Sequence, residues 1–196
     1  MGHARFTDPD GQPFDRYVVR HPGAVAVVAV DDRRRATLVR QLRPAVWSSV
    51  LEAPAGTRDV DGEPPEAAAA RELAEEAGLE ALRLELLAET WNSPGVSDQR
   101  TLVYLATGLR PCPTDRHGVE ERWMTVEQVD LDEVEALVAA GRLRDQTTVL
   151  GLLLARGALD GRGAGGPDAG GLSAGGPGTG GPGTGGPQVG GPGAPG

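Results

Sequence analysis

The sequence predicts one α/β domain of the α+β kind, in which helices cover a mixed β-sheet, followed by a disordered C-terminal tail. Three observations support this prediction. Short β-branched runs alternate with segments of helical composition, turn residues separate them, and the composition changes abruptly after Arg156. Strand pairs interleaved with helices are typical of a sheet packed between helical layers. We expect the domain at residues 1–158 and the Gly/Pro-rich tail at 159–196.

The predicted strands begin with a hairpin. Ala24–Val30 (AVAVVAV) is small and β-branched, Ala36–Leu42 partly alternates, and the polar run Asp31–Arg35 between them is typical of a turn. The arginines of this run are therefore interpreted as turn surface and not as a nucleic-acid patch. Residues 16–20 are a candidate for an earlier strand. Further strand candidates are Val50–Ala53, Leu82–Thr90, for which a helix stays open, and Thr101–Ala106.

Three helices are expected along the chain. The first covers Pro65–Ala77, because a proline suits the first helical turn and a glycine suits the position after the last one. The second covers Leu131–Ala140. The third begins at Gln146 and reaches Ala155, and its apolar composition suits packing on the domain or on a partner subunit.

The tail from Gly161 to Gly196 is half glycine and repeats GGPGT. It offers too little apolar surface to offset the entropy of ordering its backbone, so we expect it to be disordered. Its period of five residues excludes collagen, which needs a period of three. An interaction or localisation role for the tail stays open.

Charge and cysteine usage restrict the class of protein. The formal net charge of −9 argues against binding to nucleic acid, which needs a basic surface. Cys112 is the single cysteine, so no intrachain disulfide forms and a reducing compartment is expected. The first residues lack the apolar core of a signal peptide, and no apolar run approaches the length of a membrane span. These features together predict a cytoplasmic protein.

Acidic residues gather where a helix disfavours them. Glu72, Glu75 and Glu76 occupy the last turns of the first predicted helix, where the helix dipole favours cations, and only Arg71 offsets them locally. A solvated acidic face is one interpretation. The preceding Pro-Ala-Gly turn and long loop favour another, in which the carboxylates share one helical face and bind Mg²⁺ or Mn²⁺ through oxygen.

The segment around this helix resembles the Nudix box, which is a Gly, a spacer, a Glu, seven residues, and then Arg-Glu-hydrophobic-x-Glu-Glu-x-Gly-hydrophobic. Glu63, PPEAAAA and RELAEEAGL match its second part throughout, whereas six residues, one more than usual, separate Gly56 from Glu63. The extra residue lengthens a surface loop, which chains tolerate well. Flanking segments are similar to ADP-ribose pyrophosphatases over about residues 11–156, namely HPGAVAVVAV at 21–30, VRQLRPAV at 39–46, LEAPAG at 51–56 and SPGVSD at 93–98.

The resemblance implies a Nudix-type fold and a set of site residues. The metal ligands would be the carbonyl oxygen of Ala55 with Glu72 and Glu76. Glu75 would be a further ligand or the base, and Arg71 would orient the carboxylates. Similar enzymes take another carboxylate from a loop before the last strand, and the residues in that place are the candidate bases Glu120 and Glu121.

Substrate contacts are implied at four further positions. Arg43 and Glu52 match residues that touch nucleotide or ribose groups in similar enzymes, and a guanidinium suits a diphosphate because it donates two hydrogen bonds at once. The loop with Ser97 and Asp98 is expected to border the site, although Gln99 stands where many relatives carry a Glu. Two tryptophans, at positions 47 and 91, are candidates for adenine stacking or for a buried or interfacial place.

The implied activity is metal-dependent hydrolysis of a nucleoside diphosphate-X compound, with ADP-ribose giving AMP and ribose 5-phosphate. Mg²⁺ is the expected cofactor, with Mn²⁺ as an alternative, and a homodimer is the expected assembly, without nucleic-acid or membrane partners. Another nucleoside diphosphate sugar, a dinucleotide or an oxidised nucleotide is an alternative substrate. A non-catalytic ADP-ribose sensor is an alternative of another class, but such sensors tend to have lost box residues.

Overall fold

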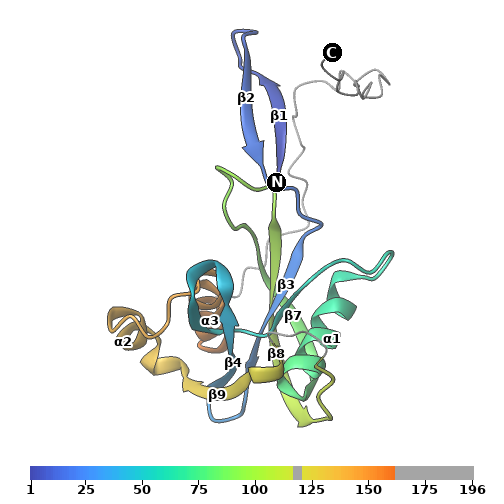
Figure 1. The fold of residues 1–196 in the computed structure, drawn as a ribbon. Helices are drawn as coiled ribbons and strands as arrows, with labels where there is room; N and C mark the ends of the chain where they lie inside the picture. Colours follow the sequence, from blue (N-terminus) through green and yellow to red (C-terminus); the bar gives the residue numbers. More distant parts are fainter. Residues whose placement is uncertain (117–120, 162–196) are drawn as a thin grey trace, which may run out of the picture. The chain divides into compact units, whose positions relative to one another are not determined.

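A computed structural model describes residues 1–116 and 121–161. Within them, Figure 1 shows a mixed sheet with helix α1 on one side and helix α3 on the other, as the sequence predicts. The expected tail lies almost wholly outside the described residues. The helices are α1 (Pro65–Ala77), α2 (Val134–Ala139) and α3 (Gln146–Leu159), and three short 3-10 turns are η1 (Pro44–Val46), η2 (Glu121–Trp123) and η3 (Leu131–Glu133).

Nine strands form two sheets in the described part of the chain. β1 and β2 make a separate antiparallel hairpin, and the other seven form the mixed sheet in the order β5-β4-β3-β8-β7, with β6 added to β3 and β9 added to β4. β3 and β8 are parallel, whereas β4, β6 and β7 pair in antiparallel fashion. The strands are β1 (Gly2–Thr7), β2 (Pro13–Val18), β3 (Ala24–Val30), β4 (Arg35–Arg43), β5 (Ser48–Glu52), β6 (Ala55–Thr57), β7 (Leu79–Trp91), β8 (Arg100–Pro111) and β9 (Thr125–Asp130).

The core has two layers, one on each face of the sheet. Side chains alternate along a strand, and in β3 Val25 and Val27 face the layer that contains Leu73 of α1, whereas Val28 faces the layer that contains Leu152 of α3. All seven residues of β3 are buried. A strand covered on both faces needs apolar residues throughout, which explains the unbroken AVAVVAV run.

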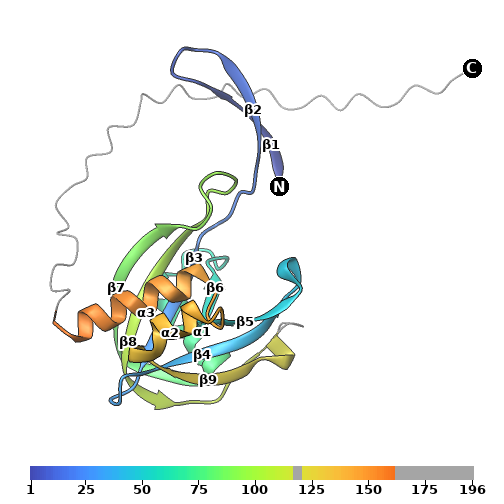
Figure 2. The ribbon, with the colours of Figure 1, turned by 90° about the vertical axis from the view of Figure 1, so that its left-hand side faces the viewer.

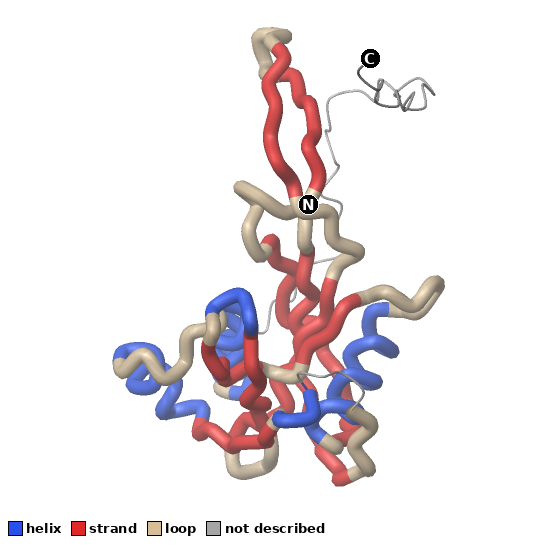
Figure 3. The backbone as a smooth tube through the Cα atoms, in the orientation of Figure 1, coloured by secondary structure: helices blue, strands red, loops and turns tan. Residues whose placement is uncertain are grey.

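Several predicted boundaries differ from the structure. The segment for which a helix stayed open is strand β7, because it pairs with β8 along most of its length. The second expected helix begins as the 3-10 turn η3, and only Val134–Ala139 is α-helical. Strands β1, β6 and β9 were not predicted. Figures 2 and 3 show α2 and α3 on the same face of the sheet, and none of the described helices has the length and apolar character of a membrane span.

Candidate functional site

Helix α1 places three carboxylates next to a backbone turn. Pro65 occupies the first turn, where its missing N–H costs nothing, and Gly78 ends the helix with φ 66°, a conformation that favours glycine. Leu73 is fully buried against the sheet. Since the apolar side of the helix fixes its rotation, the acids of the last two turns face the turn that contains β6.

The acids line a cavity of about 320 Å³ at the end of the sheet. α1 supplies the carboxylates, β6 and the residues around it supply backbone, β4 supplies a guanidinium, and η2 supplies one more carboxylate. We call this cavity the acidic pocket. Its lining residues are Gln41, Arg43, Ala55, Gly56, Thr57, Asp59, Arg71, Glu72, Glu75, Glu76 and Glu121.

Glu76 is the most buried acid of the pocket, with 5% of its surface exposed. Its Oε2 accepts a hydrogen bond of 2.9 Å from the N–H of Ala55. Burial, together with the charges of Glu72 and Glu121, raises the pKa of Glu76 to about 8, although the N–H of Ala55 and the charge of Arg43 oppose the shift. Glu72 behaves alike, since burial raises its pKa above the usual range although Arg71 opposes the shift. The charged forms of Glu72 and Glu76 are therefore disfavoured in this pocket unless a cation neutralises them.

Arg71 holds the other acids in place. Its Nη1 donates to Glu72 at 2.8 Å and to Glu75 at 3.1 Å, while its Nε and Nη2 donate to both oxygens of Glu63 at 3.0 and 3.1 Å. The hydrogen bond from Arg71 lowers the pKa of Glu63. Glu63 was not predicted as a site residue, although its fixed place in the Nudix box could have indicated a structural role. It fastens the long loop to the helix.

Gly56 allows the close approach of β6 to α1. A Cβ added at this position would lie 1.9 Å from Oε1 of Glu72, a separation that real Cβ atoms do not show. Glycine therefore lets the Ala55–Thr57 backbone pass beside this carboxylate, whereas a Cβ would displace the Glu72 side chain. The turn brings the backbone of Ala55 and the carboxylates of Glu72 and Glu76 to the same end of the sheet.

Arg43 lines the acidic pocket and is paired with Glu52 of β5. Nε of Arg43 lies 3.0 and 3.1 Å from the two oxygens of Glu52, and Nε2 of Gln41 donates to the same carboxylate at 3.3 Å. Glu52 is 7% exposed. The hydrogen bond to Glu52 raises the pKa of Arg43 and so keeps the guanidinium charged. The pair presents a positioned cation to the cavity.

A cation that the sequence did not reveal lies at the C-terminal end of α1. Nε and Nη2 of Arg116 donate to the carbonyl oxygen of Glu76 at 3.1 and 2.6 Å, and its Nη1 donates to the carbonyl of Met124 at 2.9 Å. Arg71 is the cation that lies near these acids in the sequence, and the fold adds Arg116 at the carbonyl end of the helix. Arg116 stands 40 residues from Glu76, and no local pattern shows a contact at that separation.

Other predicted site residues lie elsewhere. Asp98 is not in the acidic pocket; it accepts hydrogen bonds of 2.9 Å from Arg20 and from the N–H of His21. The hydroxyl of Ser97 donates to the carbonyl of Val19 at 3.1 Å, so both residues fasten their loop to the segment before β3. Glu120 lies outside the described residues. Gln99 lines a smaller cavity of about 140 Å³ that also contains Arg43, Glu52 and Ala55.

The residues of the acidic pocket fit a divalent metal ion. Every candidate ligand is an oxygen, from carboxylates and from the Ala55 carbonyl, which is the donor set that Mg²⁺ and Mn²⁺ prefer. Nonetheless, no three His, Cys, Asp or Glu side chains of the described residues converge on one metal position. In this structure Glu72 and Glu75 bind Arg71, and Glu76 binds the Ala55 N–H.

Comparisons with known proteins agree with this geometry. The NUDIX domain family model matches residues 20–146. The ADP-ribose pyrophosphatase of Mycobacterium tuberculosis is 39% identical over 153 residues, which cover 78% of this chain and 74% of that protein. The ADP-ribose pyrophosphatase of Bacillus subtilis is 36% identical over 71% of this chain and 75% of its own length. A crystal structure of an ADP compounds hydrolase superposes with a TM-score of 0.69 over 82% of this chain and 86% of that one, and its 24% identity supports the fold alone.

Proposed function

The chain belongs to the Nudix hydrolase family, and from this premise we propose that it hydrolyses the diphosphate bond of ADP-ribose, giving AMP and ribose 5-phosphate. The observation that carries the proposal is the acidic pocket. Carboxylates of Glu72, Glu75, Glu76 and Glu121 line it together with the guanidinium of Arg43. Such a pocket suits a diphosphate held between an arginine and metal-binding acids.

We assign the metal-binding role to the carbonyl of Ala55 and to Glu72, Glu76 and Glu75. Divalent ions bound there would neutralise the diphosphate and lower the pKa of a coordinated water. Arg71 keeps Glu72 and Glu75 beside each other through its hydrogen bonds and so acts as a positioning residue. Mg²⁺ is the proposed ion, with Mn²⁺ as the alternative.

Residues that line the acidic pocket are assigned to substrate binding and proton transfer. Arg43 faces the cavity and donates to an oxygen of the diphosphate, while buried Glu52 holds its guanidinium in position. Glu121 lines the same cavity, within reach of a water that attacks the diphosphate, and accepts its proton as general base. Glu120 is the alternative base. Ser97 and Asp98 act through the loop they fasten and not by contact with the diphosphate.

Product analysis in ¹⁸O-water tests the proposal. We expect ADP-ribose and Mg²⁺ to yield AMP and ribose 5-phosphate, with the heavy oxygen in one of the two products identifying the attacked phosphorus. A panel with other nucleoside diphosphate sugars, dinucleotides and oxidised nucleotides measures preference. If another substrate gives a higher kcat/KM than ADP-ribose, the ADP-ribose assignment is wrong although the Nudix chemistry stands.

Variants of the pocket test the residue roles. Glu76→Gln should remove nearly all turnover, whereas Glu85→Gln, at an exposed position on β7, is the matched control and should leave turnover unchanged. Glu120→Gln and Glu121→Gln, compared by pH profile, separate the two candidate bases. EDTA should abolish activity, and restoration by Mg²⁺ or Mn²⁺ identifies the ion. Light scattering of the purified chain tests the proposed homodimer.

A further inference from the structure

A second cavity, of about 650 Å³, lies where β7 ends and β8 begins. We call it the tryptophan cavity. The segment before β3, the residue after β6, the end of β7 and the start of β8 enclose it, and it shares no lining residue with the acidic pocket. Its walls include His21, Arg58, Trp91 and Arg100.

The charges around this cavity leave one guanidinium without a carboxylate. Glu89 accepts from Arg100 at 2.7 Å, and Asp98 accepts from Arg20 at 2.9 Å, so both acids of the wall are paired. Arg58 makes no ion pair with any described residue. Its Nε is the one buried side-chain nitrogen or oxygen in the described chain without a hydrogen-bond partner. A buried donor without a partner costs about 1–3 kcal/mol. The guanidinium charge of Arg58 lines the cavity without an ion pair to a described residue, so the cavity favours an anionic ligand.

The backbone fixes where Arg58 lies. Its N–H donates to the carbonyl of Gly23 at 3.0 Å, which ties the residue to the start of β3. Gly23 has φ 105°, and a Cβ added there would lie 3.7 Å from Nη1 of Arg58, so the guanidinium passes directly over this glycine. The side chain is therefore held in the cavity wall.

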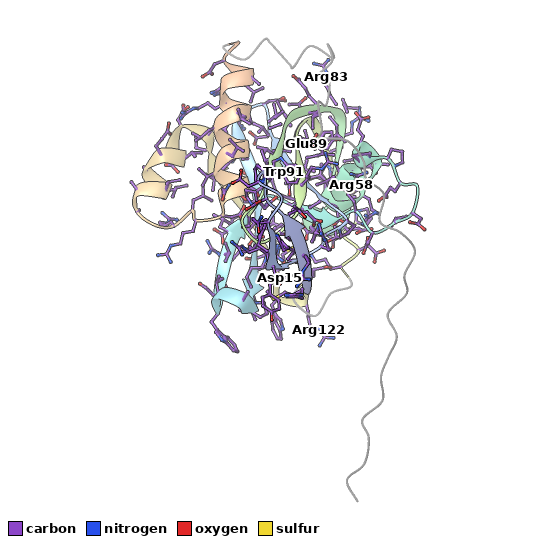
Figure 4. The ribbon with its side chains drawn as sticks, turned by 90° about the horizontal axis from the view of Figure 1, so that it is seen from above. Asp15, Arg58, Arg83, Glu89, Trp91 and Arg122 are labelled. Atoms are coloured by element: carbon purple, nitrogen blue, oxygen red, sulfur yellow. The ribbon has the colours of Figure 1, made fainter. Side chains whose placement is uncertain are left out.

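Trp91 supplies a flat surface in the same cavity. It ends β7, and 55% of its surface is exposed. The guanidinium carbon of Arg100 lies 5.6 Å from its ring centre and fixes the ring by a cation–π contact. Figure 4 shows Trp91, Glu89 and Arg58 within one region when the molecule is seen from above. An exposed, fixed indole is a surface on which a nucleobase stacks.

We propose that the tryptophan cavity binds a mononucleotide, with its phosphate on Arg58 and its base against Trp91. The guanidinium and the indole together indicate the class of ligand, because a guanidinium alone binds any anion and an indole alone binds any flat aromatic ring. The volume of the cavity accommodates a molecule of this size. This binding requires no metal, whereas the carboxylates of the acidic pocket repel a nucleotide phosphate when no metal is bound.

Calorimetric titration with AMP in EDTA tests the proposal, because chelation disables the acidic pocket. We expect one site per chain on the wild type. Arg58→Gln should weaken binding by about tenfold or more through loss of a charge-assisted hydrogen bond, and Arg58→Lys should restore part of it. Trp91→Leu should weaken it by about tenfold. Arg83→Gln, at an exposed arginine of β7 outside the cavity, is the control and should bind as the wild type does.

Truncated ligands and a pocket variant complete the test. Adenosine and inorganic phosphate should each bind more weakly than AMP, since each uses only one of the two groups. Urea unfolding of every variant checks that it is folded. Absence of AMP binding overturns the proposal. So does binding that Arg43→Gln abolishes while Arg58→Gln leaves it intact, because that result places AMP in the acidic pocket.

Discussion

Glu76→Gln should stabilise the metal-free protein at alkaline pH while it removes activity. The side chain is 5% exposed, and burial raises its pKa from 4.5 to about 8. A folded-state pKa above the unfolded one means that the folded protein binds one more proton between these values. The stability that comes from the protonated acid is thus complete below pH 4.5 and is lost as the pH rises through 8.

The size of this effect follows from the shift. Between pH 5 and pH 8 the free energy of unfolding should fall by about 1.4 kcal/mol per pH unit because of Glu76 alone, or by at most about 4 kcal/mol in total. A glutamine has nearly the same shape, and its amide oxygen can accept the N–H of Ala55. The variant therefore loses the titration and keeps the packing.

Urea unfolding of both proteins in EDTA at several pH values measures the difference. At pH 5 the two free energies of unfolding should agree within about 1 kcal/mol, and by pH 8 the Gln variant should exceed the wild type by up to about 4 kcal/mol. Other titrating groups are common to both proteins and cancel. If the two curves run parallel from pH 5 to pH 9, Glu76 does not titrate as its burial requires, and the reasoning fails.

Three substitutions test further contacts. Gly56→Ala should lower kcat at least about a hundredfold, by assay with ADP-ribose and Mg²⁺, because the new Cβ displaces Glu72; unchanged kcat would contradict this. Gly151→Ala should lower the free energy of unfolding, measured in urea, by about 1–3 kcal/mol, because its Cβ would lie 2.7 Å from a valine methyl of β3. Gly157→Ala on the same helix is the control. Its Cβ meets nothing within 4 Å, so the change should be neutral or stabilise the protein by up to about 1 kcal/mol. Arg116→Gln should destabilise by about 1–3 kcal/mol in the same measurement, since two hydrogen bonds to the end of α1 are lost, and wild-type stability would show that water replaces them.

Local signals predicted the helix that carries the acids. α1 spans the predicted Pro65–Ala77, because a proline and a glycine mark its ends whatever the tertiary context. β3 also has its predicted bounds, since a strand buried on both faces is apolar throughout. Terminal proline and glycine residues marked α1, and a continuous apolar run marked β3.

Elements that depend on pairing were missed. β6 is only Ala55–Thr57, too short to show any alternation, and it becomes a strand because β3 lies beside it. β9 carries Glu127, which pairs with Arg40 of β4. The polar residues of β9 do not show a strand pattern in the sequence, and the strand forms because it pairs with β4. The same limit applies to Asp98, whose partner Arg20 lies 78 residues away. Sequence spacing alone does not reveal such contacts.

Arg116 changes the reason for expecting a metal. The helix dipole disfavours acids in the last turns of a helix, and the acids at the end of α1 therefore predicted a bound cation. The guanidinium of Arg116 already supplies a positive charge to the carbonyl end of α1. It donates to the main chain of Glu76 and not to the carboxylate, which accepts from the N–H of Ala55 in a residue that is 5% exposed. The case for a divalent ion therefore rests on the burial of that carboxylate beside Glu72 and Glu121, a cost that the protein's own cations leave in place.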